Sequence, residues 1–477
     1  MKVLLIYPRF WPYSSPPLGL AYIASYMRDK GIDVSIIDCT FNMNKKKLIE
    51  AAKEVNPDVI GVAVITGMVT DMESIISQLR SAIPKAVFVA GGTHASAFPE
   101  IVLRNYGFDI VARGECERIF VNLVNALKSG KALNKVKGIS YIEGNKLKVT
   151  EPEPLIEDLS ELPFPARDLL PMKDYLDYRI GRSSWTVPTP STTTIGTRGC
   201  PYRCTFCATN ANYGGKIRYR SAKNYADEIE LLVNEYGVKG IWFNDDTFTM
   251  DRNWAIDIFD QLASRKIHIK WGCNTRVNVV NEELLRNMKS HGCEFISFGV
   301  ESGVQRILDN YLKKDITIEQ IKKAFTACNK VGIFTQATFM VGTPGETLQD
   351  MEQSIILAKE IKPDCIQVSI NTPLPDTEMV NIAKRLGKVK EFDWENQDYM
   401  EKGIIHTAEF TPDQVKKMQE KFLKQFYFRP GYVSHQISKI KSIYELKKRI
   451  RGFNQLFGGY VSPLSIIKKI NKTNKES

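Results

Sequence analysis

Short apolar runs alternate with amphipathic segments through the first 150 residues of the chain. Aliphatic and β-branched residues fill five runs, at residues 2–7, 34–38, 59–64, 86–90 and 109–112. Runs of this length are typical of buried strands. Residues 18–30 have apolar positions at helical spacing, and Gly31 stands where a helix commonly ends. This alternation predicts a doubly wound, Rossmann-like α/β domain with a parallel sheet over residues 1–142.

A second series of βα units begins after a change in pattern. Residues 143–190 are rich in Pro, Glu, Ser and Thr and have little periodicity, so we interpret them as a linker. Strands are then expected at residues 192–197, 240–243, 268–273, 295–299, 334–340 and 365–370. Helix N-caps are expected at Ser221, Asn281 and Thr317. Residues 191–387 therefore predict a partial (β/α)6 barrel of the TIM type, with its chemistry at the C-terminal ends of the strands.

Beyond residue 387 the apolar pattern becomes helical. Thr411 and Pro412 form a helix start, after which apolar residues recur on one helical face. These are Val415, Met418, Phe422 and Phe426. We therefore predict a helical C-terminal region over residues 388–477.

Charge is concentrated at the end of this region. Ten Lys and Arg residues lie in residues 431–477 against Glu445 and Glu476, so this tail supplies +8 of the net charge of +11. A basic tail with interleaved apolar residues predicts weak peripheral contact with an anionic membrane surface. A solvated helical face is the alternative interpretation.

Composition bounds the class of protein. At 477 residues with 43% hydrophobic and 25% charged side chains, the chain is of ordinary globular composition and too long for one core. No apolar run approaches the roughly 18 residues of a membrane helix, and Pro8 interrupts the first run too early for a secretory signal. Nine widely spread cysteines indicate a reducing compartment, so we expect a cytoplasmic protein.

The strongest chemical signal follows the first barrel strand. Cys200, Cys204 and Cys207 form a C-x3-C-x2-C motif on one short segment. Three thiolates on a loop can hold three irons of a cubane and leave the fourth iron open for a small-molecule ligand, whereas most iron–sulfur clusters take four cysteines. A zinc site needs a fourth ligand, and no His or Cys follows Cys207 closely. The motif therefore favours a [4Fe–4S] cluster with one open iron.

This motif resembles that of the radical S-adenosylmethionine (radical SAM) superfamily, and the preceding α/β domain resembles its cobalamin-binding branch, over about residues 1–390. The resemblance implies a [4Fe–4S] cluster held by Cys200, Cys204 and Cys207. It also implies that S-adenosylmethionine chelates the open iron and that reduction releases a 5′-deoxyadenosyl radical. An electron donor such as flavodoxin or ferredoxin is an implied partner.

The same resemblance implies residues around S-adenosylmethionine, each at or after a barrel strand. Candidates, with Tyr202 a weaker one, are Phe206, Asp245, Asp246, Asn274, Arg276, Glu301, Ser302, Met340 and Gly342. Several have structural alternatives. The two adjacent aspartates can cap a helix, Ser302 can be an N-cap in a tight turn, and Met340 can belong to the core.

In the α/β domain the resemblance implies a cobalamin site at the carboxyl ends of the strands. The candidates are Thr66, Gly91, Gly92, Thr93, His94 and Glu115. Glycines would let the backbone approach a flat corrin closely. The phosphate-binding pattern G-x-G-x-x-G is missing after the first strand, which disfavours a dinucleotide site. The pattern D-x-H-x-x-G is also absent, so we expect the lower face of cobalt to lack a protein imidazole, with His94 as the alternative ligand.

Two functions fit these cofactors. The first is methylation of an unactivated carbon in a small molecule or lipid, and the alternative is a radical cyclisation or rearrangement of a tetrapyrrole-like substrate. A non-catalytic cobalamin carrier would leave the cysteine motif unused. A methylthiotransferase acting on nucleic acid would need a further cluster domain, but only Cys39 and Cys116 precede Cys200. We therefore do not expect nucleic acid as a partner.

Overall fold

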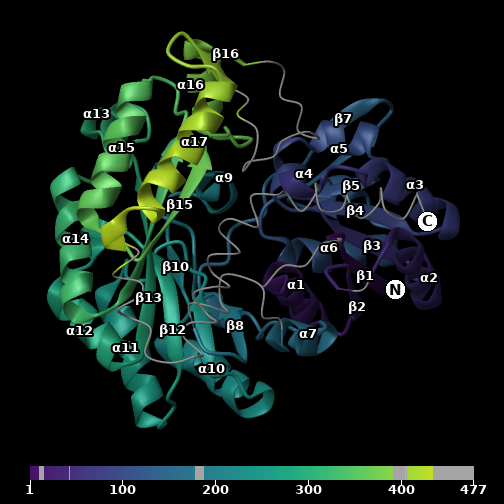
Figure 1. The fold of residues 1–477 in the computed structure, drawn as a ribbon. Coiled ribbons are helices and arrows are strands. Elements are labelled where there is room, and N and C mark those ends of the chain that lie inside the picture. Colours follow the sequence, from purple (N-terminus) through teal and green to yellow (C-terminus); the bar gives the residue numbers. More distant parts are fainter. Residues whose placement is uncertain are drawn as a thin grey trace, which may run out of the picture.

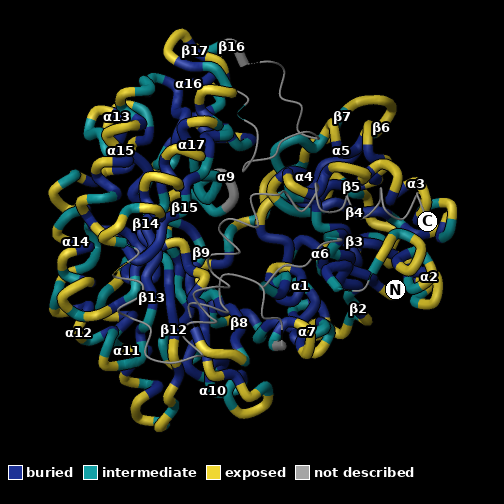
Figure 2. Tube along the Cα trace, in the orientation of Figure 1, coloured by how far each residue is buried: buried dark blue, intermediate teal, exposed yellow. Residues whose placement is uncertain are grey.

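The structure, a computed structural model, describes residues 1–9, 15–41, 43–177, 187–389, 403, 405–432 and 434. Two α/β bodies lie side by side, with the N-terminal sheet in one and a partial barrel in the other (Figure 1). In both, buried strands lie beneath helices whose outer faces are exposed (Figure 2). No helix within the described ranges is long and apolar enough to cross a membrane.

The N-terminal sheet has the strand order β2-β1-β3-β4-β5-β6-β7. Its parallel strands are β1 (Lys2–Tyr7), β2 (Asp33–Asp38), β3 (Val59–Ala63), β4 (Val87–Gly91) and β5 (Ile110–Ala112), and its antiparallel strands are β6 (Ile139–Glu143) and β7 (Lys146–Val149). The predicted doubly wound domain is confirmed. The order reverses between β1 and β3, and ligands bind beyond the carboxyl ends of strands at such a point.

Helices cover both faces of this sheet. On one face lie α1 (Leu18–Asp29) and α6 (Cys116–Ser129), and on the other lie α2 (Lys45–Val55), α3 (Met72–Ala82), α4 (Thr93–Ala97) and α5 (Pro99–Asn105). The helix predicted at residues 18–30 is therefore α1, and Gly31 follows its end with φ +72°. Apolar stripes on these helices bury against the strands, which explains why the local periodicity predicted them.

The segment predicted as a linker is partly structured. Its first residues form β7, and it also contains α7 (Met172–Asp177). Ile156, Leu159 and Leu162 are buried against Leu18 and Tyr22 of α1. The prolines remove periodicity but leave enough apolar side chains to pack, so the interpretation of residues 143–190 as a plain linker was wrong for these parts.

The barrel has six parallel strands in the order β15-β14-β13-β12-β11-β8. They are β8 (Ser191–Thr194), β11 (Gly240–Phe243), β12 (Lys270–Thr275), β13 (Cys293–Glu301), β14 (Phe334–Val341) and β15 (Cys365–Ile370), as the six predicted units require. The predicted strand at residues 192–197 is interrupted, because the chain leaves the sheet after β8 to form a small hairpin of β9 (Thr197–Arg198) and β10 (Arg218–Tyr219).

The helices outside the barrel are α10 (Ala222–Tyr236), α11 (Arg252–Ser264), α12 (Glu282–Ser290), α13 (Gln305–Asn310), α14 (Ile318–Val331), α15 (Leu348–Ile361) and α16 (Glu378–Leu386). Three of them, α10, α12 and α14, begin where the sequence predicted. Ser221, Asn281 and Thr317 each cap a helix through a side-chain oxygen that accepts a backbone N–H. One apolar cluster joins these helices to the outer faces of the strands.

The C-terminal helix α17 (Pro412–Tyr427) belongs to the barrel core. Val415, Met418, Phe422 and Phe426 are buried in the same apolar cluster as the strands. Gln419 donates to the carbonyl of Val368 at 2.8 Å, and the Tyr427 hydroxyl bonds the backbone of Ile366, so α17 satisfies polar groups on the edge strand β15.

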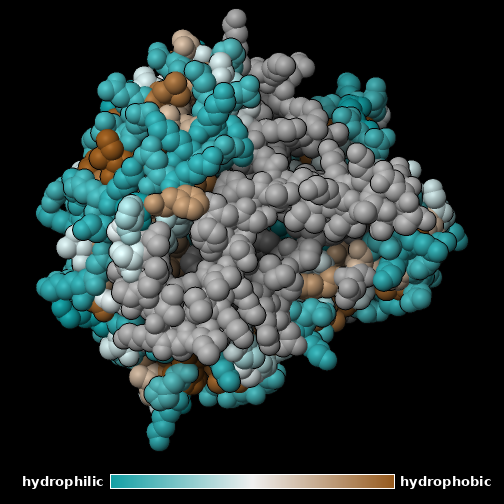
Figure 3. Space-filling model, viewed as in Figure 1, coloured by the Kyte–Doolittle hydropathy of each residue, from teal (hydrophilic) through white to brown (hydrophobic). Residues whose placement is uncertain are grey.

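Two further predictions for the C-terminal region have different outcomes. Directly after α16, β16 (Gly387–Val389) pairs with β17 (Ile405–Thr407) in an antiparallel ladder, so the purely helical prediction was wrong there. The β-branched residues Ile405 and Thr407 favour a strand. The basic tail lies outside the described residues, except for a few at its start. The described surface is mostly hydrophilic in Figure 3, with small apolar patches.

Candidate functional site

The three motif cysteines lie on the loop between β9 and α9 (Thr209–Tyr213), on the side of the barrel that faces the N-terminal domain (Figure 1). All three side chains are partly exposed. Burial raises the pKa of Cys200, and Asp246, Cys204 and Cys207 act in the same direction. In the described part of the chain no three His, Cys, Asp or Glu side chains converge closely enough to hold one metal ion.

Backbone contacts fix this loop at both ends. Gly199 has φ +92°, and a Cβ at this position would lie 2.3 Å from the carbonyl oxygen of Lys216, so only glycine fits before Cys200. The Thr205 hydroxyl donates to the carbonyl of Tyr311 at 2.6 Å, and the backbone N–H of Met379 donates to the carbonyl of Thr205 at 2.8 Å. The loop is therefore anchored to the elements after β13 and β15.

The adjacent aspartates after β11 have different surroundings. Asp245 is 1% exposed, and its Oδ1 accepts from the backbone N–H groups of Gly196 and Thr197 and from the Thr197 hydroxyl. These bonds turn the chain out of β8 toward the cysteine loop. Asp246 is instead exposed and acts electrostatically on Cys200. Asp245 therefore belongs to the scaffold at the strand end, and Asp246 remains the candidate for contact with S-adenosylmethionine.

Glu301 ends β13 beside a lysine that the sequence analysis missed. Glu301 has φ +68° and is 8% exposed, and its Oε1 lies 3.0 Å from the Nζ of Lys314. The Lys314 ammonium also lies 5.5 Å from the ring centroid of Phe206 in the cysteine loop. Ser302 is fully buried, and its hydroxyl accepts from the N–H of Val304 within its own turn. Glu301 and Phe206 are therefore near each other, whereas Ser302 supports the turn.

Arg276 and Asn274 lie at the end of β12. Arg276 is 5% exposed, and its Nη1 donates to the Sγ of Cys204 at 3.6 Å. Its guanidinium carbon lies 3.5 Å from the ring centroid of Tyr202. Asn274 is partly exposed, on the opposite face of β12 from Cys273, which is in the outer core. The strand end thus brings both candidates to the barrel mouth.

The two candidates at the end of β14, Met340 and Gly342, have different surroundings. Met340 is partly exposed between the core residues Phe339 and Val341, so it points into the barrel interior. Gly342 has φ +79°, and a Cβ there would lie 2.8 Å from Val415 of α17, so helix packing requires this glycine. Its N–H donates to Glu346, a fully buried side chain that the sequence analysis did not select. Burial raises the pKa of Glu346 to about 8.

A cavity of about 460 Å³ lies between the two domains. Three of the predicted cobalamin residues line it: Thr66, Thr93 and Glu115. From the barrel side it is lined by Ala208, next to Cys207, and by the loop at residues 374–376. The rim of the sheet and the cysteine loop therefore face a common space, as a group held between the two rims requires.

The other cobalamin candidates support the rim from behind. His94 is 1% exposed, and its Nδ1 lies 3.3 Å from the Thr66 hydroxyl. Burial lowers the pKa of His94 to about 4. Gly92 has φ +106°, and a Cβ there would lie 2.9 Å from the Val64 carbonyl, so strand packing requires this glycine. Gly91 ends β4 beside the Cys116 thiol. The described residues that line the cavity do not include His94, Gly91 or Gly92.

Buried ion pairs join the domains next to the site. Glu115 pairs with Arg198 at 3.1 Å and with Arg218 at 2.8 Å, and Arg198 also pairs with Glu117 at 2.5 Å. Burial opposes ionisation of Glu115, but Arg218 and Arg198 outweigh it and lower its pKa. The sequence analysis named Glu115 but missed these partners, because no local spacing connects residues so far apart.

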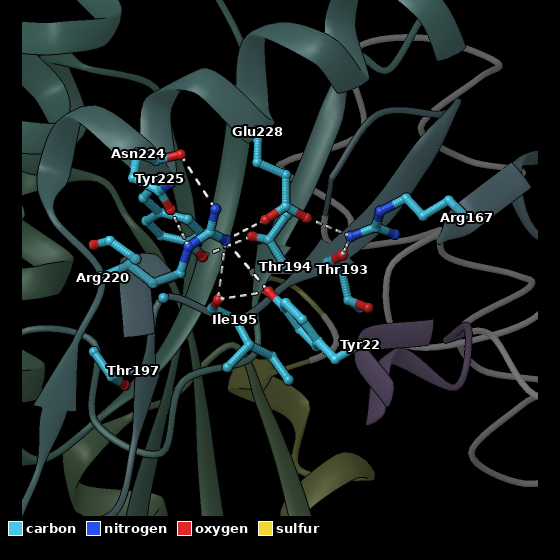
Figure 4. Close-up of polar contacts among 12 residues, drawn as sticks. Tyr22, Arg167, Thr193, Thr194, Ile195, Thr197, Arg220, Asn224, Tyr225 and Glu228 are labelled. Atoms are coloured by element: carbon cyan, nitrogen blue, oxygen red, sulfur yellow. Dashed lines mark hydrogen bonds and ion pairs between the residues drawn. The ribbon is translucent and has the colours of Figure 1, made fainter. Parts of the chain in front are cut away.

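A second network of buried ion pairs is centred on Glu228 (Figure 4). Glu228 of α10 pairs with Arg167 at 3.0 Å and with Arg220, and Arg167 also donates to the carbonyl of Thr193 in β8. The Tyr22 hydroxyl, on α1 of the N-terminal domain, accepts from Arg220 at 3.3 Å. The network thus links α1, the predicted linker and the barrel.

Comparisons with known proteins agree with this arrangement. Residues 194–358 match the Radical SAM superfamily, and residues 11–124 match the B12 binding domain. An uncharacterized methyltransferase from Pyrococcus horikoshii is 32% identical over 471 residues, which are 96% of this chain and 99% of that protein. The anaerobic magnesium-protoporphyrin IX monomethyl ester cyclase from Rubrivivax gelatinosus is 28% identical over 473 residues, 96% of this chain and 82% of the cyclase.

A solved structure shares the fold. The radical S-adenosylmethionine methyltransferase TsrM from Kitasatospora setae, with tryptophan and a S-adenosylmethionine analogue bound, superposes with a TM-score of 0.71 at 18% identity, covering 90% of each chain. The near full-length similarity to the Pyrococcus horikoshii protein, together with the two domain matches, shows the family. This chain belongs to the cobalamin-binding branch of the radical SAM superfamily and is a cobalamin-dependent enzyme that uses a [4Fe–4S] cluster and S-adenosylmethionine.

Proposed function

We propose that this enzyme methylates an unactivated carbon of a small molecule or lipid. The observation that carries this proposal is the shared cavity, lined by Thr66 and Thr93 on one side and by Ala208 beside Cys207 on the other. A substrate in that space would lie between a methyl donor and a hydrogen abstractor. When bound, cobalamin supplies the methyl group, and the cluster with S-adenosylmethionine supplies the radical.

The residues take distinct roles in this proposal. Cys200, Cys204 and Cys207 hold the cluster, because they are three partly exposed thiols on one anchored loop. Phe206, Asp246, Asn274, Glu301 and Met340 surround S-adenosylmethionine at the strand ends. Thr66, Thr93 and Glu115 hold cobalamin from the sheet side. A low-potential donor such as flavodoxin or ferredoxin supplies the electron.

A radical cyclase is the second candidate, because the Rubrivivax gelatinosus relative is named as a cyclase and matches 96% of this chain. The test uses anaerobic holoenzyme, S-adenosylmethionine with a deuterated methyl group, and a metabolite extract from cells that lack the gene. Methylation predicts S-adenosylhomocysteine together with 5′-deoxyadenosine and a product that carries the deuterated methyl. Formation of 5′-deoxyadenosine with an unlabelled product would contradict methylation and favour the cyclase.

A further inference from the structure

We propose that Arg276 sets the reduction potential of the cluster by placing a buried positive charge on one of its ligand sulfurs. The Nη1 of Arg276 donates to the Sγ of Cys204 at 3.6 Å, within reach of an N–H···S hydrogen bond. This inference rests on the proposed assignment of the three cysteines as cluster ligands. It gives Arg276 a role different from the S-adenosylmethionine contact that the sequence analysis expected.

The Arg276 guanidinium is held by hydrogen bonds and by an aromatic ring against its face. Its Nε donates to the Oδ1 of Asn278 at 3.3 Å, and its Nη2 donates to the carbonyl oxygen of Lys314. Its face lies 3.5 Å from the ring centroid of Tyr202, and the Tyr202 hydroxyl accepts from Asn278 at 3.2 Å. Each nitrogen of the guanidinium thus already has one acceptor, and these bonds fix the side chain against the loop.

The charge of Arg276 is also uncompensated. The side chain is 5% exposed, and among the described residues no carboxylate forms an ion pair with it. A cation in a poorly solvated position interacts strongly with nearby charge. Hydrogen bonds to cluster sulfurs and the local charge are established means by which a protein tunes such potentials.

The direction of the effect follows from the charge balance of reduction. One electron enters the cluster from a one-electron reductant, no bond forms or breaks, and the cluster becomes more negative by one charge. A fixed cation stabilises the reduced form more than the oxidised form, so Arg276 raises the potential. The cluster is then easier to reduce, which the cleavage of S-adenosylmethionine requires.

The test is a redox titration of the anaerobic holoenzyme with dithionite, followed by the electron paramagnetic resonance signal of the reduced cluster. Arg276→Gln removes the charge, and we expect its equilibrium constant for reduction to fall about tenfold or more, where tenfold is about 59 mV for one electron. Arg276→Lys keeps the charge but not all three hydrogen bonds, so a smaller fall is expected. Arg286→Gln, at an exposed ion pair on α12, is the matched control and should titrate as wild type.

A wild-type potential in Arg276→Gln with four irons bound would overturn the inference. If that variant does not assemble four irons, Arg276→Met, which also removes the charge, is titrated in its place. A lowered potential supports the inference, and a wild-type potential overturns it. Failure of the wild-type protein itself to bind four irons would refute the cysteine assignment instead, so the two failures are distinguishable.

Discussion

Arg198, two residues before Cys200, forms an ion pair with Glu115 of the N-terminal domain at an Nη1–Oε1 distance of 3.1 Å. The two side chains are 11% and 3% exposed. Glu115 also lines the cavity between the domains, so one carboxylate contacts both the cavity and the base of the cysteine loop. The positions of the two predicted cofactor sites therefore depend on a common buried contact.

Replacement of this arginine should weaken the domain interface. Arg198→Gln leaves two buried carboxylates short of a partner, and breaking a buried pair in this way costs about 3–5 kcal/mol. Urea unfolding at neutral pH measures the loss. The control is Arg28→Gln at the exposed pair with Asp168, where the side chains are 41% and 57% exposed and the expected cost is about 0–1 kcal/mol. Equal stability losses in the two variants would contradict the role of the buried pair.

Each cluster cysteine should be essential. Cys200→Ala, Cys204→Ala or Cys207→Ala leaves two protein thiolates for the cubane, so we expect loss of bound iron and of 5′-deoxyadenosine formation. Iron analysis and chromatography of the products after anaerobic reconstitution measure both. Cys328→Ala, at a fully buried thiol on α14, is the control and should retain iron. Any motif variant with full iron content and turnover would refute the assignment.

Glu228 should make stability depend on acid pH. Burial raises the pKa of Glu228, but Arg220 and Arg167 outweigh burial and hold it below its usual 4.5. Because the folded pKa is depressed, the stabilisation is complete above pH 4.5 and is lost as pH falls below it. Glu228→Gln should therefore cost about 3–5 kcal/mol at pH 7 and less in acid.

Urea unfolding of the wild type and of Glu228→Gln across this pH range checks the expectation. Glu230→Gln, on the same helix but 42% exposed, is the control and should change stability by about 1 kcal/mol or less. A difference between Glu228→Gln and the wild type that stays constant with pH would show that the carboxylate does not titrate as expected.

Substitutions at the two adjacent aspartates should distinguish a structural residue, Asp245, from a binding residue, Asp246. Burial raises the pKa of Asp245 to about 6, above its usual 3.8, so its contribution to stability is full below pH 3.8 and is lost as pH rises through 6. Asp245→Asn keeps an oxygen for the three donors and should remove this loss, gaining stability relative to the wild type between these values. Asp245→Ala leaves the donors unpaired and should cost about 1–3 kcal/mol.

Substitution of Asp246 should weaken binding of S-adenosylmethionine and leave stability almost unchanged. Because it is exposed, Asp246→Asn should leave the unfolding free energy within about 0.5 kcal/mol of the wild type. Loss of a charged hydrogen bond should weaken binding of S-adenosylmethionine by about tenfold or more. Equilibrium binding to the reconstituted protein measures this. Unchanged affinity in Asp246→Asn would remove Asp246 from the site.

Cobalt should have no histidine on its lower face. His94, the alternative ligand, is 1% exposed and lies behind the rim of the sheet, in contact with Thr66. Electron paramagnetic resonance of the cob(II) form is expected to lack the superhyperfine triplets that an axial nitrogen produces. Triplets that vanish in His94→Ala would reverse this prediction and make His94 a ligand.

Local patterns in the chain predicted most of the elements. Apolar runs located β1 and β11 to the residue, because a strand buried on both faces needs an unbroken apolar stretch. Ser221, Asn281 and Thr317 predicted helix starts, because a cap bonds the N–H only a few residues ahead. The spacing of Cys200, Cys204 and Cys207 indicated the cluster in the same way, since all three thiols lie on one loop.

By itself, then, the sequence determined the fold class, the order of the elements and the cysteine motif, all of which depend on neighbours within a few residues. Only the tertiary structure decided that Asp245 supports the scaffold, that His94 lies behind the rim and that Lys314 approaches Glu301. The pair of Arg198 and Glu115 spans 83 residues. The sequence does not indicate whether a carboxylate faces water, a cofactor or a distant guanidinium. Its surroundings are determined by how the chain packs.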